Sequence, residues 1–178
     1  MEVGEPDFPT PEPVIRAGQQ ALADGRTHYT PAAGLPELRE AISAYYAERH
    51  GVNVAPDRIV VTPGASGALQ LIMGVLVDPG DRVLLPDPGY PCNPNFVRLF
   101  EGEGVTVPVD GASDYQLTSA HLRDHWDERT VAAMIGSPSN PTGTVATGED
   151  LQVLAAAAAE RGGRLIVDEI YHGLVYDD

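Results

Sequence analysis

Short apolar runs alternate with amphipathic runs along most of the chain. The apolar runs lie at residues 58–62, 82–86, 105–109, 131–135 and 164–168. Apolar positions with helical spacing lie at 66–77, near 118–127 and at 148–161. Continuous apolar strands are typical of parallel sheets covered on both faces, and their alternation with helices indicates βαβ units. The pattern predicts an α/β fold with three layers: a mostly parallel sheet with helices on both faces.

The first part of the chain has a different pattern. Residues 1–12 are rich in proline and lack periodicity, which predicts an extended arm. A helix with Pro13 in its first turn and a stop at Gly25 is expected next, followed by a second helix from Pro36 to Gly51. We expect the second helix to bury its apolar positions Leu38, Ile42 and either Tyr45 or Tyr46.

Composition narrows the possible partners. The chain has 178 residues and a formal net charge of −15, which argues against binding to nucleic acids or anionic membrane surfaces. The chain has 11 arginines and no lysine, so it has no side-chain amine. The single cysteine, Cys92, excludes an internal disulfide, and no export signal is evident, so a reducing cytoplasm is the expected location.

In parallel sheets ligands bind beyond the carboxyl ends of the strands, so the loops there are the places to search. After the run at 58–62, the segment PGASGAL passes from a glycine-rich turn into a helix and leaves the N–H groups of residues 64–67 free. Free N–H groups and the helix dipole favour a phosphate, and Ser66 adds a hydroxyl donor. The alternative is a tight turn with Ser66 as the helix N-cap.

Three further loops carry polar or aromatic candidates. DPGYPCNP presents Tyr90, which either stacks on a planar ligand or packs the loop, while Cys92 beside it is expected to be a packing residue. GSPSNPTG holds Asn140, either a ligand contact or part of an Asx-turn. Asp168 ends an apolar strand, where a carboxylate is unfavourable unless it meets a cation.

Two rival sites are weaker. The run ending in Asp168 and Glu169 is similar to the magnesium-binding strand of P-loop nucleotide hydrolases, but those proteins need a lysine that this chain lacks. His121 and His125 have the spacing of a metal pair on a helix. Because no third ligand has suitable spacing, a solvated helix surface is the preferred reading.

Six segments, taken in order, carry a resemblance to a known family: GEPDFPTP, HYTPAAGLPELREAI, VTPGASGAL, PDPGYP, SPSNPTG and IVDEIYHGLVY. They closely resemble the amino-terminal part of class I/II aminotransferases, which are fold-type I enzymes that use pyridoxal 5'-phosphate. The match extends from Gly4 to Tyr176. It implies that residues 13–178 are part of the cofactor-binding large domain of the pyridoxal-phosphate-dependent transferase fold, with the remainder absent.

The resemblance implies roles for individual residues. Asp168 is expected to pair with the pyridine nitrogen of the cofactor and to keep it protonated. Tyr171 and Asn140 are expected to contact the phenolic oxygen, with Asn140 also near the substrate. The Ala65 N–H and Ser66 are expected to hold the phosphate, and Tyr90 to stack on the ring.

Two more residues match family positions outside these loops. Tyr29 matches a tyrosine that reaches the cofactor phosphate of the neighbouring subunit, which implies a homodimer. Gly4 matches a stretch near the substrate carboxylate.

Family members also carry a lysine that forms a Schiff base with the cofactor and a later arginine that binds the substrate carboxylate; neither matches a position in this chain. We therefore expect the amino-terminal part of an aminotransferase that acts on an amino acid and a 2-oxo acid, inactive by itself. Two alternatives remain open. One is a lysine-free module that binds the cofactor or an amino-acid adduct without turnover, and the other is half of a pyridoxal-phosphate-dependent lyase.

Overall fold

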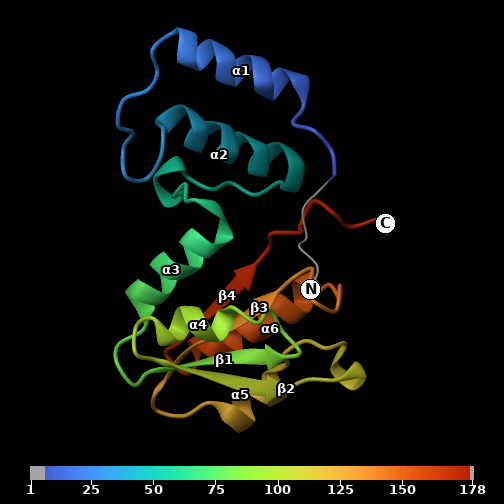
Figure 1. The fold of residues 1–178 in the computed structure, drawn as a ribbon. Helices are drawn as coiled ribbons and strands as arrows, with labels where there is room; N and C mark the ends of the chain where they lie inside the picture. Colours follow the sequence, from blue (N-terminus) through green and yellow to red (C-terminus); the bar gives the residue numbers. More distant parts are fainter. Residues whose placement is uncertain (1–6, 177–178) are drawn as a thin grey trace. The chain divides into compact units, whose positions relative to one another are not determined.

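The computed structural model describes residues 7–176, and the chain divides into two compact units, Met1–Val61 and Thr62–Asp178 (Figure 1). The first unit holds helix α1 (Glu12–Ala23), helix α2 (Pro36–His50) and the short 3-10 helix η1 (Pro56–Arg58). Both helices begin and end as the sequence predicts: Pro13 lies in the first turn of α1, and α2 ends at Gly51, whose φ of 67° is left-handed. Residues 1–6 of the predicted arm at 1–12 lie outside the described residues, and Glu12 already belongs to α1, so the arm stays a prediction.

The expected burial of the α2 apolar positions is wrong. No residue of α2 is buried, and Leu38 and Tyr45 are 44% and 53% exposed. The buried hydrophobic residues of the described chain all belong to the second unit. Two helices and one helical turn do not supply enough apolar surface around α2 to enclose these side chains.

The second unit contains a four-stranded sheet and its covering helices. In chain order its elements are α3 (Gly64–Leu76), β1 (Arg82–Asp87), α4 (Asn93–Arg98), β2 (Glu103–Pro108), η2 (Gly111–Ser113), α5 (Ser119–His125), β3 (Thr130–Gly136), α6 (Gly148–Ala159) and β4 (Arg164–Asp168). The strand order is β2-β1-β3-β4 and every pairing is parallel, for example Leu84 with Val105 and Ala133 with Leu165. The predicted parallel α/β sheet is confirmed.

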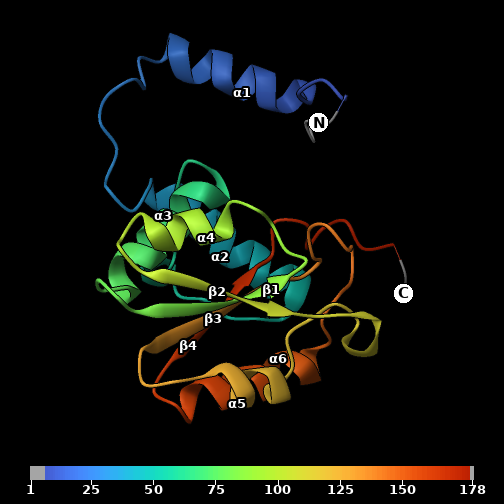
Figure 2. The same cartoon turned by 60° about the horizontal axis from the view of Figure 1, so that its bottom comes forward.

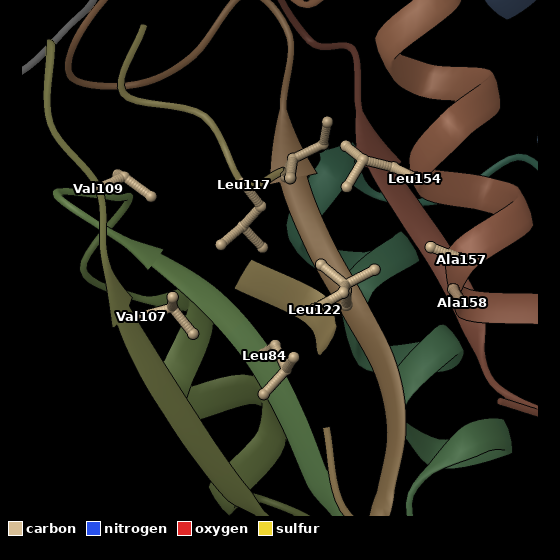
Figure 3. Packing of buried hydrophobic residues seen from close by; sticks show 10 residues of the cluster. Leu84, Val107, Val109, Leu117, Leu122, Leu154, Ala157 and Ala158 are labelled. Atoms are coloured by element: carbon tan, nitrogen blue, oxygen red, sulfur yellow. The ribbon is translucent and has the colours of Figure 1, made fainter. Parts of the chain in front are cut away.

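Helices cover both faces of this sheet, α3 and α4 on one side and α5 and α6 on the other (Figure 2). The strands supply both cores because successive side chains point to opposite faces. Val83 and Leu85 pack with α3 and α4, whereas Leu84 between them packs with α5 and α6. Figure 3 shows the second of these cores, where Leu84, Leu122 and Leu154 point into one apolar layer. Double burial explains why successive residues in the middle of β1, β3 and β4 are apolar.

One predicted strand does not form. Residues 59–62 are irregular, and the Val61 N–H donates to the carbonyl oxygen of Ala33 at 3.0 Å rather than to a strand. A strand persists only where a neighbouring strand offers a ladder of hydrogen bonds, and no strand of the described chain pairs with this segment. Conversely, α4 was not predicted, because its six residues are too short for a helical period to show.

Candidate functional site

A cavity of about 320 Å³ lies at the carboxyl edge of the sheet in the second unit. Its wall is built from the start of α3, the loops after β1 and β3, and the end of β4 with the turn that follows. Six residues singled out from the sequence line it together: Ala65, Ser66, Tyr90, Asn140, Asp168 and Tyr171. They come from four separate stretches of chain. Three of these stretches end or follow β1, β3 and β4, which are parallel and therefore end at the same edge of the sheet, and the fourth is the start of α3.

The first wall is the amino end of α3. The helix begins at Gly64, whose φ of 72° is left-handed, and its N-cap Pro63 offers no capping side chain. The Gly64 N–H donates to the Thr62 carbonyl at 2.8 Å, whereas the amides of Ala65 and Ser66, in the first helical turn, have no intrahelical acceptor. Ser66 is the third helical residue, so the alternative that it is the N-cap is wrong. Uncapped amides and the helix dipole make this end of the cavity attractive to an anion.

The opposite wall is the end of β4. Asp168 is half-buried, and its Oδ1 accepts a hydrogen bond from the Ile170 N–H at 3.1 Å. Within residues 7–176 no cationic side chain forms an ion pair with this carboxylate. Tyr171 follows in the turn and is 37% exposed. Asp168 therefore offers the cavity a negative charge whose second oxygen is available to a donor.

Tyr90 lies in the wall formed by the loop after β1. A Cβ at Gly89, the preceding residue, would lie 2.5 Å from the Pro86 carbonyl oxygen, so this loop requires glycine there. The Cys92 side chain, through a hydrogen bond and its charge, raises the pKa of Tyr90, and burial, Tyr171 and Asp168 raise it further. Tyr90 thus remains an uncharged phenol at neutral pH and presents an aromatic ring beside Asp168 and Tyr171.

Asn93 is a cavity residue that the sequence analysis did not find. It is 9% exposed, lines the cavity, and its side-chain Oδ1 is buried without a hydrogen-bond partner among the described residues. An unsatisfied buried carbonyl costs about 1–3 kcal/mol, and such groups often mark a site where a ligand or water donates. No sequence signal identifies it, because an asparagine before a proline is an ordinary residue in a turn-rich segment.

Asn140 and Ser139 come from the loop after β3. Asn140 is exposed toward solvent and Ser139 is buried, 8% exposed. The Ser137 N–H donates to the backbone oxygen of Asp168 at 2.9 Å, which continues the pairing of β3 with β4 into this loop. The loop and Asp168 therefore share one backbone framework.

Other sequence candidates lie outside the cavity. Tyr29 belongs to the first unit and is fully exposed, and Gly4 lies outside the described residues. On α5, the His121 Nδ1 accepts the Thr118 N–H at 3.1 Å as part of a capping box. Across residues 7–176 no cluster of His, Cys, Asp or Glu is placed to hold a metal ion. Over the same residues, no helix has the length and apolar character that a membrane span needs.

Comparison with known sequences gives a consistent result. The sequence model of the family described as aminotransferase class I and II matches residues 1–178. A probable aspartate/prephenate aminotransferase of Aquifex aeolicus is 43% identical over 175 residues, which are 98% of this chain and 44% of that protein. A valine–pyruvate aminotransferase of Mycobacterium tuberculosis is 41% identical over 176 residues, 99% of this chain and 45% of that protein.

Solved structures agree with the sequence comparison. An aminotransferase from Mycobacterium tuberculosis superimposes with a TM-score of 0.93 at 40% identity and covers 99% of this chain and 48% of its own. The aspartate aminotransferase from Thermus thermophilus with maleate gives 0.93 at 39% identity, with 99% and 46% covered. The chain thus spans less than half the length of these relatives.

Proposed function

The chain belongs to the class I and II aminotransferase family, and we propose that it carries the part of such an enzyme that holds pyridoxal 5'-phosphate. The complete reaction is the transfer of an amino group between an amino acid and a 2-oxo acid. The observation that carries the proposal is the gathering of Ala65, Ser66, Tyr90, Asn140, Asp168 and Tyr171 around one cavity.

The cavity fits the proposed cofactor at both ends. Uncapped amides at the start of α3 suit a phosphate, and the carboxylate of Asp168, which lacks a cation among the described residues, suits a protonated ring nitrogen. The Asn93 Oδ1, which has no hydrogen-bond partner among the described residues, adds a buried acceptor to the same cavity. When bound, pyridoxal phosphate supplies an electron sink for negative charge that develops at the substrate α-carbon.

At the phosphate end, the Ala65 N–H and the Ser66 hydroxyl donate hydrogen bonds to phosphate oxygens. Charge-assisted hydrogen bonds of this kind are about twice as strong as neutral ones. The positive end of the α3 dipole adds to them. These residues fix the position of the ligand and take no part in proton transfer.

At the ring end, the Asp168 carboxylate holds a proton on the ring nitrogen, because a nearby negative charge favours the protonated form of a base. Tyr171 and Asn140 donate hydrogen bonds to the phenolic oxygen and favour its ionised form. Tyr90 packs its ring against the face of the bound heterocycle. Together these residues orient the ring and set its charge.

Movement of the substrate α-proton needs a further group. In this family a lysine amine carries that proton, and this chain has no lysine. Arginine does not replace it, because its guanidinium stays protonated. The proposal therefore assigns the amine to polypeptide outside these 178 residues. Participation of Tyr29 across a homodimer axis, and of Gly4 beside the substrate carboxylate, belongs to the same proposal.

Ligand binding to the isolated chain tests the proposal. Pyridoxamine 5'-phosphate has no aldehyde, so it binds without a lysine and reports only on the residues of this chain. We expect calorimetric titration to show one site per chain and a clear preference for pyridoxamine phosphate over phosphate-free pyridoxamine. Ser66→Ala should reduce that preference. Equal affinity for the two ligands, in wild type and variant alike, would remove the assignment of the α3 end as the phosphate site.

A second assay separates the aminotransferase from its alternatives. The longer polypeptide, extended through the sequence that follows residue 178 in its gene, should convert an amino acid and a 2-oxo acid into the exchanged pair. Release of pyruvate and ammonia from the amino acid would instead indicate a lyase. Ligand binding without turnover, with no lysine encoded downstream, would indicate the binding module.

A further inference from the structure

The loop of residues 137–143 presents Asn140 to the cavity but contains no regular secondary structure. Two backbone hydrogen bonds close it on itself: the Ser139 N–H donates to the Thr144 carbonyl at 2.9 Å, and the Gly143 N–H donates to the Ser139 carbonyl at 2.8 Å. These bonds define the shape of the loop. They do not by themselves attach the loop to the rest of the second unit.

The first residue of the loop is held by the Ser137 N–H, which donates to the Asp168 carbonyl at 2.9 Å, and by the Ser137 Oγ, which accepts the Ala146 N–H at 3.0 Å. Gln116 adds a side-chain anchor from outside the cavity. Its side-chain Nε2 lies 3.2 Å from the Gly136 carbonyl oxygen and 3.3 Å from the Thr144 carbonyl oxygen. The same nitrogen lies 3.1 Å from the Thr144 Oγ1. Gly136 ends β3 immediately before the loop and Thr144 follows the loop. One buried amide, 7% exposed, thus joins both ends of the loop that carries Asn140.

The backbone before Gln116 is unusual. Asp114 and Tyr115 have φ values of 48° and 54°, two consecutive left-handed residues that are not glycine. Such conformations are uncommon for residues with a Cβ and persist where the surrounding structure requires them. The Tyr115 N–H donates to the Asp110 carbonyl at 2.8 Å and the Gln116 N–H to the Ser113 carbonyl at 2.9 Å, which hold this turn in place. The turn places the Gln116 side chain within hydrogen-bond distance of Gly136 and Thr144.

We propose that Gln116 is a positioning residue of the cofactor site, acting through the 137–143 loop to hold Asn140 at the phenolic oxygen of the ligand. The proposal deepens the function proposed above and rests on it. Gln116 does not contact the ligand, since it is absent from the cavity wall. Its amide fixes where the loop begins and ends, and the position of Asn140 follows from both.

A purely structural role makes a different prediction. A residue that only fills space beside the core would tolerate a leucine of similar volume, or would destabilise the whole unit when changed. A positioning residue affects the loop and the ligand contact made by Asn140, while distant parts of the site are unchanged. Gln116→Leu removes the donors and keeps the volume. Gln152→Leu, on the exposed surface of α6, is the matched control.

The first measurement needs no ligand. Hydrogen–deuterium exchange of the ligand-free chain should show faster exchange of the Ser139 and Gly143 amides in Gln116→Leu, with the β1 and β3 amides unchanged. Gln152→Leu should match the wild type. Thr144→Val removes the hydroxyl that lies 3.1 Å from the Gln116 Nε2 and 2.9 Å from the Thr142 Oγ1. It should give the same effect to a smaller degree, and a larger effect than Thr142→Val, which removes only the second contact. A Gln116→Leu variant that fails to fold therefore leaves the proposal testable. Two results for Thr144→Val would overturn the proposal. One is an equal increase in exchange rate across the whole unit, and the other is an exchange rate of the loop amides that does not differ from the wild type.

The second measurement is a double-mutant cycle on pyridoxamine phosphate affinity. We expect Gln116→Leu to weaken binding about 3- to 10-fold, a size typical of residues coupled within one network. Its effect should largely vanish in an Asn140→Ala background and persist in a Ser66→Ala background. Additive effects with Asn140→Ala would refute action through Asn140. Wild-type chain that binds no pyridoxamine phosphate would instead refute the proposed function, whereas the exchange result would still decide whether Gln116 anchors the loop.

Discussion

Replacing Asp168 by asparagine removes one negative charge from the cavity while keeping the size of the side chain. The Oδ1 of the asparagine still accepts the Ile170 N–H, as the aspartate does at 3.1 Å. The other position, an oxygen in the aspartate, becomes an NH₂ group. A protonated ring nitrogen facing that group then meets a donor instead of a charged acceptor, so the variant favours the unprotonated ring.

The size of the effect follows from the exposure of the carboxylate. A hydrogen bond to a charged group contributes about 1.5–3 kcal/mol. Because Asp168 is half-buried rather than fully buried, water screens the interaction and the lower part of this range applies, about 1.5–2 kcal/mol. We therefore expect pyridoxamine phosphate to bind about 10- to 30-fold more weakly to Asp168→Asn.

Calorimetric titration measures the affinity, and absorbance of the bound ligand against pH measures protonation of its ring. In the proposed binding mode the Asp168 carboxylate raises the pKa of the ring nitrogen of the bound ligand, so the ligand bound to Asp168→Asn should lose its ring proton at lower pH than in the wild type. Glu169→Gln, one residue further on and outside the cavity wall, should change affinity less than about twofold. Equal losses in the two variants, or an unchanged absorbance titration in Asp168→Asn, would refute the role given to Asp168.

Two further predictions concern the frame around the cavity. Gly89→Ala should weaken pyridoxamine phosphate binding, because the added Cβ would lie 2.5 Å from the Pro86 carbonyl oxygen and displace the loop. Circular dichroism should show little change in secondary structure, and a variant with wild-type affinity would contradict the prediction. The pKa of Asp127 lies below its usual 3.8, chiefly because the Thr130 hydroxyl donates to it and also because of Arg82. The stabilising effect of ionised Asp127 is thus complete above about pH 3.8 and is lost as the pH falls through its lower pKa in the folded protein. The denaturation midpoints of wild type and Asp127→Asn should therefore differ at neutral pH and converge in acid. A difference between the midpoints that grows in acid would contradict this pH dependence.

Much of the second unit is predictable from local pattern. The strands at Leu84, Met134 and Ile166 are covered on both faces, so their apolar runs carry the information about the sheet directly. The same reasoning failed at Val61, since an apolar run becomes a strand only when a partner strand is present. The exposed Leu38 shows the same dependence of burial on neighbouring elements.

The candidate site was predictable where residue type and place in the topology agree. Asp168 ends an apolar strand, and Ser66 follows a glycine turn, so each has a local signal. Asn93 and Gln116 have no local signal. The role of Asn93 depends on a buried oxygen without a hydrogen-bond partner among the described residues, and the role of Gln116 depends on three acceptor atoms far away in the sequence. Tyr29 has no local signal of this kind either, because the role proposed for it lies at a neighbouring subunit.

A crystal structure of the chain with pyridoxamine 5'-phosphate would show where each end of the ligand binds. We expect the phosphate at the Ala65 and Ser66 amides and the ring nitrogen within hydrogen-bond distance of the Asp168 carboxylate, with Tyr90 against the ring face. A ligand bound elsewhere, or one in this cavity with its phosphate toward Asp168 and its ring toward α3, would contradict it.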